Sequence, residues 1–383
     1  MTTTAIIGAR VLTPHGDPSP HGVLIDGTRI ARLLGPDERP DADQVIDLDG
    51  GWLLPGFIDT QVNGGGGVLF NDAPTVEGLA TIAAAHRRFG TTGLLPTLIS
   101  DDLSVVERAI TAIDDAIAAG VPGVIGIHIE GPFLNADKRG IHDAAKFRTI
   151  DAEALALLTR PGRGARLVTL APELAPPGAI RALTAAGVIV AAGHSMADHD
   201  QTRAALDEGL AGFTHLFNAM TQLGSREPGM VGAALDDRAS MFGLILDGHH
   251  VAPTTLRVAL AARGLEGAML VTDAMSTIDT DMTRFTLMGR EITVADGTLR
   301  GADGTLAGSA LTMAEAFRNA ATMLRLDVAQ ISRLASGNPA RFLRLDHQVG
   351  SIAPGLRADL VHLDANNRVT STWIAGEFSE RGE

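Results

Sequence analysis

The sequence predicts an α/β protein built around a (β/α)8 barrel, with a small β-sandwich domain formed by both ends of the chain. Eight short apolar runs alternate with helical patterns between residues 53 and 345. Short β-like runs separated by Gly, Pro and Asp occupy residues 1–52 and 346–383. Neither end is long enough to build a core of its own, so we expect the two ends to pair into one domain.

The expected barrel strands are 53–61, 92–99, 124–130, 166–171, 188–193, 212–215, 242–247 and 268–273. Helical patterns lie in most of the gaps, at 76–89, 103–119, 152–158, 196–210 and 254–262, and again after the last strand at 312–324 and 328–335. An insertion follows the eighth strand, and its residues 285–299 have the pattern of a β-hairpin. This alternation over almost 300 residues favours a closed TIM-like barrel. An open doubly wound sheet is the alternative, and no GxGxxG after the first strand supports it.

Composition narrows the class of function. The 383 residues include 31 basic and 45 acidic side chains, a formal net charge of −14, which argues against nucleic acid or an anionic membrane as the main partner. The chain has no cysteine and no tyrosine, so disulfides, thiolate catalysis and cysteine-bound zinc are excluded. Without a signal-like N-terminus or an apolar run of about 20 residues, the expected location is the cytoplasm.

Polar residues end several of the apolar runs, and three of them suit a metal. Glu130, His194 and His215 each close an expected strand. The C-terminal ends of barrel strands meet on one face, so two imidazoles and one carboxylate would converge there and leave a position for water. Asp273, at the end of the eighth strand, suits a general base for that water.

Gln61 and Asn63 close the first expected strand. Alternate residues on a strand share a face, so both side chains should point into the site. Neutral amides are poor metal ligands beside imidazole. A second metal is therefore not expected there.

The motifs together resemble the N-acetylglucosamine-6-phosphate deacetylase family of the amidohydrolase superfamily, over nearly the whole chain. The matching segments are Leu54-Pro-Gly-Phe-Ile-Asp59, His128-Ile-Glu130-Gly-Pro-Phe133, Ala192-Gly-His194-Ser195, Thr214-His215-Leu-Phe-Asn218-Ala-Met220, Arg226-Glu-Pro-Gly229, Asp247-Gly-His-His250-Val251, Val271-Thr-Asp273-Ala274 and Leu306-Ala-Gly-Ser309. The resemblance implies hydrolysis of the acetamide of N-acetyl-D-glucosamine 6-phosphate to D-glucosamine 6-phosphate and acetate.

The resemblance also bears on the metal. Many amidohydrolases carry His-x-His after the first strand, whereas this chain has Gln61-x-Asn63 and resembles the single-metal variant of the deacetylases. It thus implies one divalent ion, zinc or alternatively Fe(II), held by Glu130, His194 and His215.

Further roles follow from the resemblance position by position. His142 would contact the sugar and stabilise the acetyl oxygen, and Asn218 and Ala219 would hold the phosphate. Arg226 and His250 would add positive charge, one of them across a homodimer. The remaining positions implied to contact substrate are Gln61, Asn63, Leu306 and Ser309.

Two alternatives stay open at this point. The same scaffold could act on another amino-sugar phosphate, such as N-acetylgalactosamine 6-phosphate. The other alternative is a regulatory homologue that binds no metal. Such a homologue should lack some of the ligand residues, whereas Glu130, His194 and His215 are all present in this chain. Among the other polar residues, His128 is expected behind the ligands, His86 is expected to be an ordinary helix residue, and Lys138 a solvated loop residue.

Overall fold

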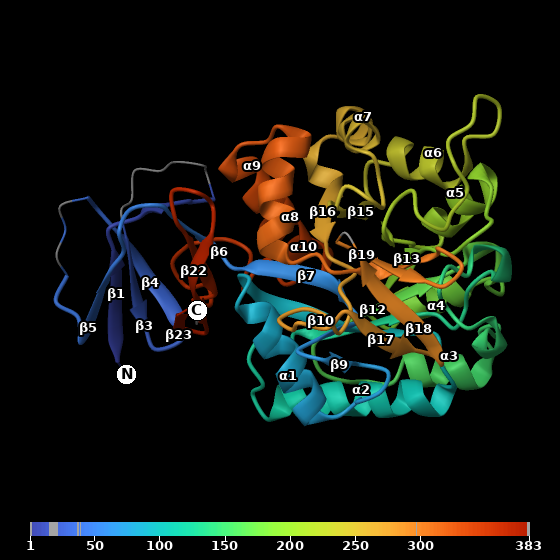
Figure 1. The fold of residues 1–383 in the computed structure, drawn as a ribbon, viewed down its shortest axis with the longest axis horizontal. Coiled ribbons are helices and arrows are strands. Elements are labelled where there is room, and N and C mark those ends of the chain that lie inside the picture. The colour runs from blue at the N-terminus through green and yellow to red at the C-terminus, as the bar shows by residue number, and fades with distance from the viewer. Residues whose placement is uncertain (1, 15–21, 37, 39, 296, 381–383) are drawn as a thin grey trace.

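Eight parallel strands in the middle of the chain form one sheet, and their order in space follows the sequence (Figure 1). Its outermost strands meet where Val62 and Ala274 form a parallel bridge and the N–H of Asp273 donates to the carbonyl of Gln61 at 3.0 Å. This contact closes the sheet, so the predicted (β/α)8 barrel is confirmed. The computed structural model describes residues 2–14, 22–36, 38, 40–295 and 297–380. The barrel strands are β7 (Phe57–Val62), β10 (Thr91–Ile99), β11 (Gly126–Glu130), β12 (Ala165–Leu170), β13 (Ile189–Ala192), β14 (Gly212–Phe213), β15 (Met241–Ile245) and β16 (Ala268–Val271).

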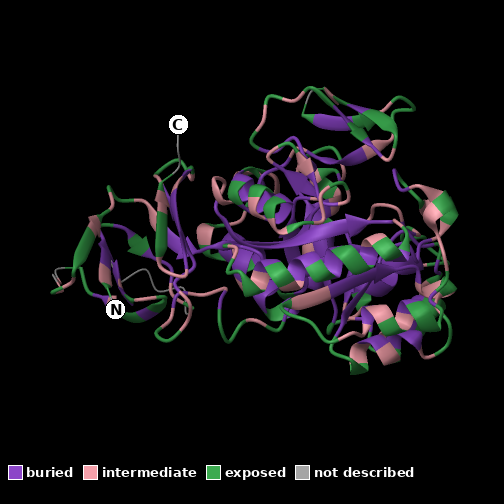
Figure 2. Cartoon of the chain, turned by 90° about the horizontal axis from the view of Figure 1, so that it is seen from below, coloured by how far each residue is buried: buried purple, intermediate pink, exposed green. Residues whose placement is uncertain are grey.

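Helices connect successive strands and cover the outside of the barrel. In Figure 2 the strands are buried along their length, whereas the helices around them alternate buried and exposed residues. The helices are α1 (Val76–Arg87), α2 (Leu103–Ala118), α3 (Ala152–Leu158), α4 (Ala179–Ala185), α5 (His199–Asp207), α6 (Gly229–Asp236), α7 (Pro253–Arg263), α8 (Met313–Asn319), α9 (Val328–Ser332) and α10 (Asn338–Phe342). Short 3-10 turns are η1 (Ala136–Lys138), η2 (Ala144–Lys146), η3 (Pro172–Leu174) and η4 (Leu265–Gly267), and π-helical turns η5 (Ala320–Leu324) and η6 (Arg333–Gly337) continue α8 and α9.

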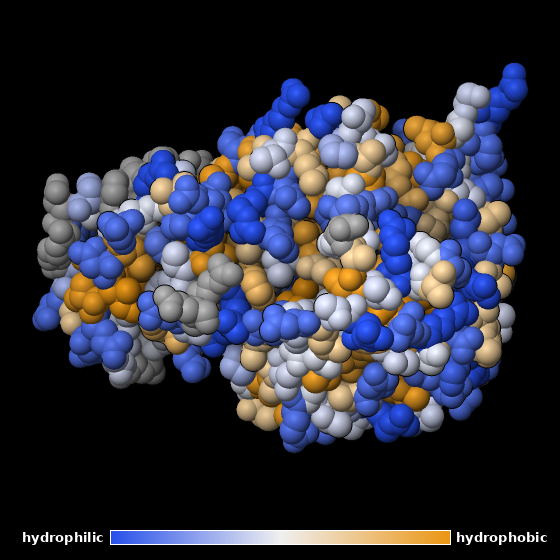
Figure 3. Space-filling view, viewed as in Figure 1, coloured by the Kyte–Doolittle hydropathy of each residue, from blue (hydrophilic) through white to orange (hydrophobic). Residues whose placement is uncertain are grey.

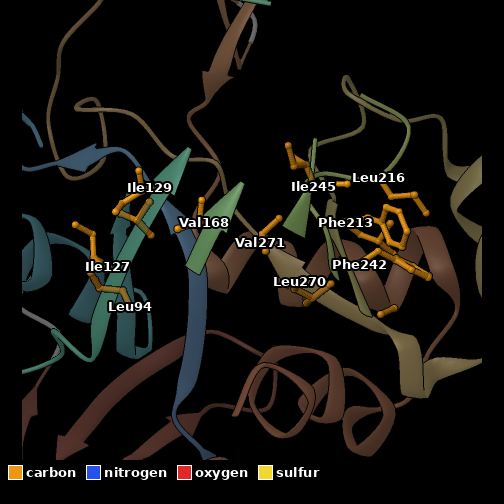
Figure 4. Packing of buried hydrophobic residues seen from close by; sticks show 14 of the residues in the cluster. Leu94, Ile127, Ile129, Val168, Phe213, Leu216, Phe242, Ile245, Leu270 and Val271 are labelled. Carbon is orange, nitrogen blue, oxygen red and sulfur yellow. The ribbon is translucent and has the colours of Figure 1, made fainter. Parts of the chain in front are cut away.

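The layer between strands and helices follows from residue spacing. On α2, Val106, Ile110 and Ile113 recur at helical spacing and are all buried. They belong to the same apolar cluster as Ile127 and Ile129, which alternate along β11 with residues of the opposite face (Figure 4). Burying each such side chain contributes about 1.5–3 kcal/mol. Because β11 faces helices on one side, its other face is free to carry His128 and Glu130 inside the barrel.

The two chain ends form a β-sandwich beside the barrel (Figure 1). One sheet has the order β4-β3-β1-β5 and the other β2-β6-β21-β22-β23, and a buried cluster that includes Ile6, Ile25, Leu360 and Trp373 lies between them. The strands are β1 (Thr3–Ile7), β2 (Arg10–Val11), β3 (Gly22–Asp26), β4 (Arg29–Leu34), β5 (Gln44–Asp47), β6 (Trp52–Pro55), β21 (Leu360–Leu363), β22 (Val369–Ile374) and β23 (Glu377–Glu380). The predicted sandwich is thereby confirmed.

The run expected as the first barrel strand, 53–61, is divided between the two bodies. β6 pairs with β2 and β21 in the sandwich, and β7 begins the barrel after Gly56. The sequence shows one continuous apolar run here because both strands are buried. The division at residues 52/53 and 345/346 stays a prediction.

An antiparallel sheet follows β16, where the sequence predicts a hairpin. Its strands are β17 (Arg284–Leu287), β18 (Arg290–Ala295), β19 (Thr298–Gly301) and β20 (Leu306–Ser309), paired in that order. A shorter hairpin, β8 (Gly64–Gly65) with β9 (Val68–Leu69), follows β7. Ser309 forms a bridge with Ala274, so β20 lies beside the segment that follows β16. Within the described ranges, none of the helices has the length and apolar character that crossing a membrane requires.

Candidate active site

A cavity of about 350 Å³ lies at the C-terminal ends of the barrel strands. Its position agrees with the rule that function in such barrels sits on this face. The lining residues are Ile99, Glu130, Asp137, Lys138, Gly140, Ile141, His142, His194, His215, Asn218, Ala219, His250, Asp273, Met275, Thr305, Leu306 and Gly308. Most of the residues singled out in the sequence therefore meet in one place.

Three buried side chains form a tight triangle in this cavity. Oε1 of Glu130 lies 3.2 Å from Nε2 of His194 and 3.0 Å from Nε2 of His215, and the two imidazole nitrogens are 3.0 Å apart. Among the described residues these form a group whose ligand atoms could hold one ion. With ligand bonds of about 2.0–2.2 Å, a single divalent ion fits a triangle of this size.

The hydrogen bonding of the triangle supports the same conclusion. Nδ1 of His194 lies 2.8 Å from the carbonyl of Lys138, so that nitrogen carries the proton and, in the neutral ring, Nε2 presents a lone pair. That lone pair, the Nε2 atom of His215 and the carboxylate of Glu130 converge on one point, as the ligands of a bound cation do. The donor set therefore fits a divalent metal.

The backbone turns sharply at both histidines. His194 has φ of 50° and His215 has φ of 35°, in the left-handed region that residues with a Cβ rarely adopt. Asp273 shares this conformation with φ of 54°. Each follows the end of a barrel strand, and each turn directs a side chain into the cavity. The surrounding packing must hold these strained backbone conformations in place. Such strain is common at functional sites.

The charges within the triangle shift the pKa values of its members. Although burial alone would raise the pKa of Glu130, its close contacts with the imidazoles of His194 and His215 hold it well below its usual range. Burial alone would lower the pKa of His215, but its contact with Glu130 raises it overall. The carboxylate is thus ionised and available as a ligand.

Asp273 faces the triangle and is held by two amides. Its Oδ1 accepts hydrogen bonds from Nδ2 of Asn63 at 2.7 Å and from Nε2 of Gln61 at 3.2 Å. Gln61 also donates to Oε2 of Glu130 at 3.1 Å. Burial and the charge of Glu130 raise the pKa of Asp273 to about 6, against the opposing effect of His215. A carboxylate with a pKa near the working pH suits a general base.

His142 lies against the triangle from the loop that follows β11. Its ring centroid is 4.5 Å from that of His194, and its Nδ1 is 2.8 Å from Oγ of Ser100. Burial, with a smaller contribution from His194, lowers the pKa of His142 to about 3. The imidazole is therefore neutral and can act as a hydrogen-bond donor to substrate.

The other predicted substrate contacts divide into two groups. Asn218, Ala219, His250 and Leu306 line the cavity. Nδ1 of His250 lies 2.6 Å from Oδ2 of Asp247, which orients that ring. The side chains of Gln61, Asn63 and Ser309 instead support the site from behind: the two amides bind Asp273, and the Ser309 hydroxyl donates to the carbonyl of Thr272 at 2.6 Å. Arg226 is exposed and lies outside the cavity lining.

His128 and His86, which lie outside the triangle, are also buried. His128 lies behind the ligands as expected, with Nε2 2.7 Å from Oγ1 of Thr169. His86, expected to be an ordinary helix residue, is fully buried, and its Nε2 lies 2.9 Å from the carbonyl of Gly64. Its spacing from Leu79 and Ile82 places it on the buried face of α1, and that periodicity was the available signal.

Sequence reasoning missed contacts made by loops. Lys138, expected to be a solvated loop residue, lines the cavity, and its carbonyl binds His194. Ser100, which contacts His142, was not singled out. A backbone carbonyl and a lone serine carry no motif, so neither had a distinctive signal.

Comparison with known proteins agrees with this geometry. Residues 52–378 match the model of the amidohydrolase family. The N-acetylgalactosamine-6-phosphate deacetylase of Shewanella sp. (strain ANA-3) is 48% identical over 336 residues, which cover 88% of this chain and 85% of that protein.

Two solved structures of similar proteins cover almost the whole chain. The crystal structure of N-acetylglucosamine-6-phosphate deacetylase from Pasteurella multocida has a TM-score of 0.95 at 32% identity, covering 99% of this chain and 100% of that chain. An aspartate-to-alanine mutant of the Mycobacterium smegmatis enzyme, in complex with N-acetyl-D-glucosamine 6-phosphate, has a TM-score of 0.88 at 34% identity and covers 99% of each chain. The chain belongs to the amidohydrolase family, in the group that contains the N-acetylgalactosamine- and N-acetylglucosamine-6-phosphate deacetylases.

Proposed function

We propose that this protein hydrolyses the acetamide of N-acetyl-D-glucosamine 6-phosphate to D-glucosamine 6-phosphate and acetate in the cytoplasm. The observation that carries the proposal is the meeting of the Glu130–His194–His215 triangle, Asp273 and His142 in one cavity. A metal-ligand set, a base and a neutral donor are the groups that amide hydrolysis requires.

We assign Glu130, His194 and His215 as the ligands of one divalent ion, Zn²⁺ or alternatively Fe²⁺. Imidazole and carboxylate ligands suit both ions. When bound, such an ion lowers the pKa of a water and polarises a carbonyl. The position that would hold a second ion in a dinuclear site carries the amides of Gln61 and Asn63, which are bound to Asp273 and Glu130.

The protein's own groups then move the protons. Asp273, ionised above its pKa, accepts a proton from the attacking water. The ring N–H of His142 donates to the acetyl oxygen as negative charge develops there. Asp273 then returns the proton to the departing amine, which is too basic to leave as an anion.

The phosphate of the substrate would bind on the side of the cavity that Asn218 and Ala219 line. Asn218 and Ala219 come three and four residues after His215 and line the cavity, so one loop would connect the metal ligand to the phosphate position. Nδ2 of Asn218 donates to the carbonyl of His215 at 3.1 Å, which ties this loop to the ligand. His250 adds a donor nearby.

Arg226 would reach the phosphate of a partner subunit in a homodimer. The loop between β14 and α6 that carries it projects from the barrel (Figure 1), and the tip is hydrophilic on the surface (Figure 3). Arg226 has no ion pair with any described residue. Leu223 on the same loop is 58% exposed, and Leu174 in η3 and Met196 after β13 are each 43% exposed. An exposed cation beside exposed apolar side chains is consistent with an interface.

N-acetylgalactosamine 6-phosphate is a second candidate substrate. It is favoured by the 48% identity to the Shewanella protein, which carries that activity in its name. The two sugars differ only in the configuration at C4, so the acetamide chemistry is the same. The choice between them depends on the sugar contacts in the cavity.

Acetate release from both sugar phosphates, measured on protein of known metal content, tests the proposal. We expect turnover of at least one substrate, with one equivalent of metal per chain. The ratio of the two kcat/KM values decides between the candidates. Metal-loaded protein that releases acetate from neither would contradict the proposed function.

A further inference from the structure

Ser100 makes two contacts with the same nitrogen of His142. It directly follows β10, is fully buried, and lies behind the cavity. Its Oγ is 2.8 Å from Nδ1 of His142, and its backbone N–H points to the same nitrogen with N to Nδ1 of 3.4 Å. His142 itself comes from the loop after β11, so the contact joins residues 42 positions apart.

These contacts decide which ring nitrogen carries the proton. A backbone N–H can only donate, so Nδ1 of His142 must be an acceptor. The serine hydroxyl, which can donate or accept, then also donates to Nδ1. In a neutral imidazole the other nitrogen, Nε2, carries the hydrogen. Since Nδ1 is turned toward Ser100, Nε2 is the nitrogen left for the cavity that His142 lines.

We propose that Ser100 is a positioning residue that holds His142 in the Nε2–H form and so presents an N–H, rather than a lone pair, to the acetyl oxygen. The inference rests on the proposed function and adds a residue to it. A ring in the other form would place a lone pair against the developing oxyanion and repel it. Ser100 acts through His142 and does not itself touch substrate.

The surroundings of Ser100 hold its hydroxyl in place. The side chain of Asn71 binds both backbone groups of Ile99, accepting from its N–H at 3.0 Å and donating to its carbonyl at 3.0 Å. Gly131, directly after Glu130, has φ of +90°, and a Cβ there would lie 2.2 Å from Oγ of Ser100. The absence of a side chain at Gly131 leaves the space that the hydroxyl occupies.

The first test replaces Ser100→Ala in the metal-loaded enzyme. The variant loses the hydroxyl but keeps the backbone donor, so we expect kcat to fall about tenfold, the size of one net hydrogen bond, while KM stays within about twofold. Ser100→Thr restores a hydroxyl and should recover most of kcat. Ser336→Ala is the matched control, because Ser336 is equally buried and its hydroxyl donates to the carbonyl of Pro55 outside the cavity.

The second test reads the ring directly and does not depend on turnover. Histidine-selective ¹⁵N labelling of the metal-loaded protein, with the signal assigned by a His142→Gln variant, should show protonated Nε2 and unprotonated Nδ1 in the wild type. In Ser100→Ala the Nε2–H population should fall. Protonated Nδ1 in the wild type overturns the proposal, as does an unchanged kcat and ring form in Ser100→Ala.

The two tests separate this inference from the proposed function. Wild-type protein inactive on both sugar phosphates but with Nε2–H at His142 would contradict the function and leave the positioning by Ser100 intact. Active wild-type protein with a protonated Nδ1 at His142 would support the proposed function and contradict the positioning by Ser100. If Ser100→Ala does not fold, the ring form of the wild type and the activity of Ser100→Thr decide the question.

Discussion

Nδ2 of Asn63, the residue after the first barrel strand, lies 2.7 Å from Oδ1 of Asp273, the proposed base, which follows the last barrel strand. The two strands meet where the barrel closes, through the bridge between Val62 and Ala274. Closure of the sheet and orientation of the base are therefore achieved at the same place.

Replacing Asn63→Ala should shift the acid limb of the pH–rate profile upward. Asp273 works as a base when ionised, so kcat/KM falls as pH drops through its pKa, and the hydrogen bond from Asn63 lowers that pKa. Its removal should raise the midpoint by roughly one pH unit. The control is Asn338→Ala, a buried amide bound to the carbonyls of Leu265 and Ala268. If the midpoint does not move, Asn63 does not influence the pKa of the base.

Asp273→Asn should keep its metal and lose nearly all turnover. The amide preserves the shape of the side chain but cannot accept the proton, and positioned general bases contribute about 10²- to 10⁴-fold. Metal content by elemental analysis and kcat by acetate release measure the two effects. Asp200→Asn, whose side chain is 98% exposed, serves as the control. Turnover near the wild-type rate in Asp273→Asn would rule out this base.

Metal should stabilise the wild type and fail to stabilise His215→Asn. An ion that binds only the folded state adds about 4 kcal/mol at a thousand times its Kd, which raises Tm. Loss of one of three ligands should abolish most of that gain. Thermal unfolding with Zn²⁺ and with Fe²⁺ under anaerobic conditions measures it, and His347→Asn, an exposed histidine, is the control. Equal Tm gains in wild type and His215→Asn would contradict the assigned ligand set.

Mixing Arg226→Ala with Asp273→Asn should restore kcat/KM if Arg226 acts across a dimer. Arg226→Ala should raise KM for the sugar phosphate, because a charge-assisted contact is lost. In a hybrid with Asp273→Asn, the Arg226→Ala subunit keeps its base and receives Arg226 from its partner. Arg163→Ala, an exposed arginine, should leave KM unchanged. No gain in kcat/KM in the hybrid over the separate variants would place Arg226 in its own subunit or outside the site.

His86 should make the fold less stable at mildly acidic pH. Burial lowers its pKa to about 4, against the opposing effect of its bond to Gly64, so the unfolded chain binds a proton that the folded chain does not. The free energy of unfolding should therefore fall as pH drops from about 6.5 toward 4, by about 2 kcal/mol between pH 7 and pH 5 from this group. Urea unfolding at both pH values, compared with His86→Gln, isolates the contribution. An identical pH dependence in the variant would contradict it.

The barrel and the ligand triangle could be predicted because both follow from local patterns. Apolar runs of strand length alternate with helical spacing, and Glu130, His194 and His215 each close such a run. Parallel strands of one barrel bring their C-terminal ends together whatever the loops do. The break at Gly56 could not be predicted, because two buried strands that follow each other look like one apolar run.

The fold class, the convergence of Glu130, His194 and His215, and the place of Asp273 beside them could all be predicted without the structure. The reason is that hydrophobic periodicity and the order of strands along the chain are local features of a sequence. The structure was needed to show that Asn63 and Gln61 hold Asp273, that the ring of His86 contacts the carbonyl of Gly64, and that Ser100 contacts His142. These hydrogen bonds join residues that are far apart in the sequence. Whether they form depends on the path of the loops and on the packing around them, and neither is encoded in a local pattern.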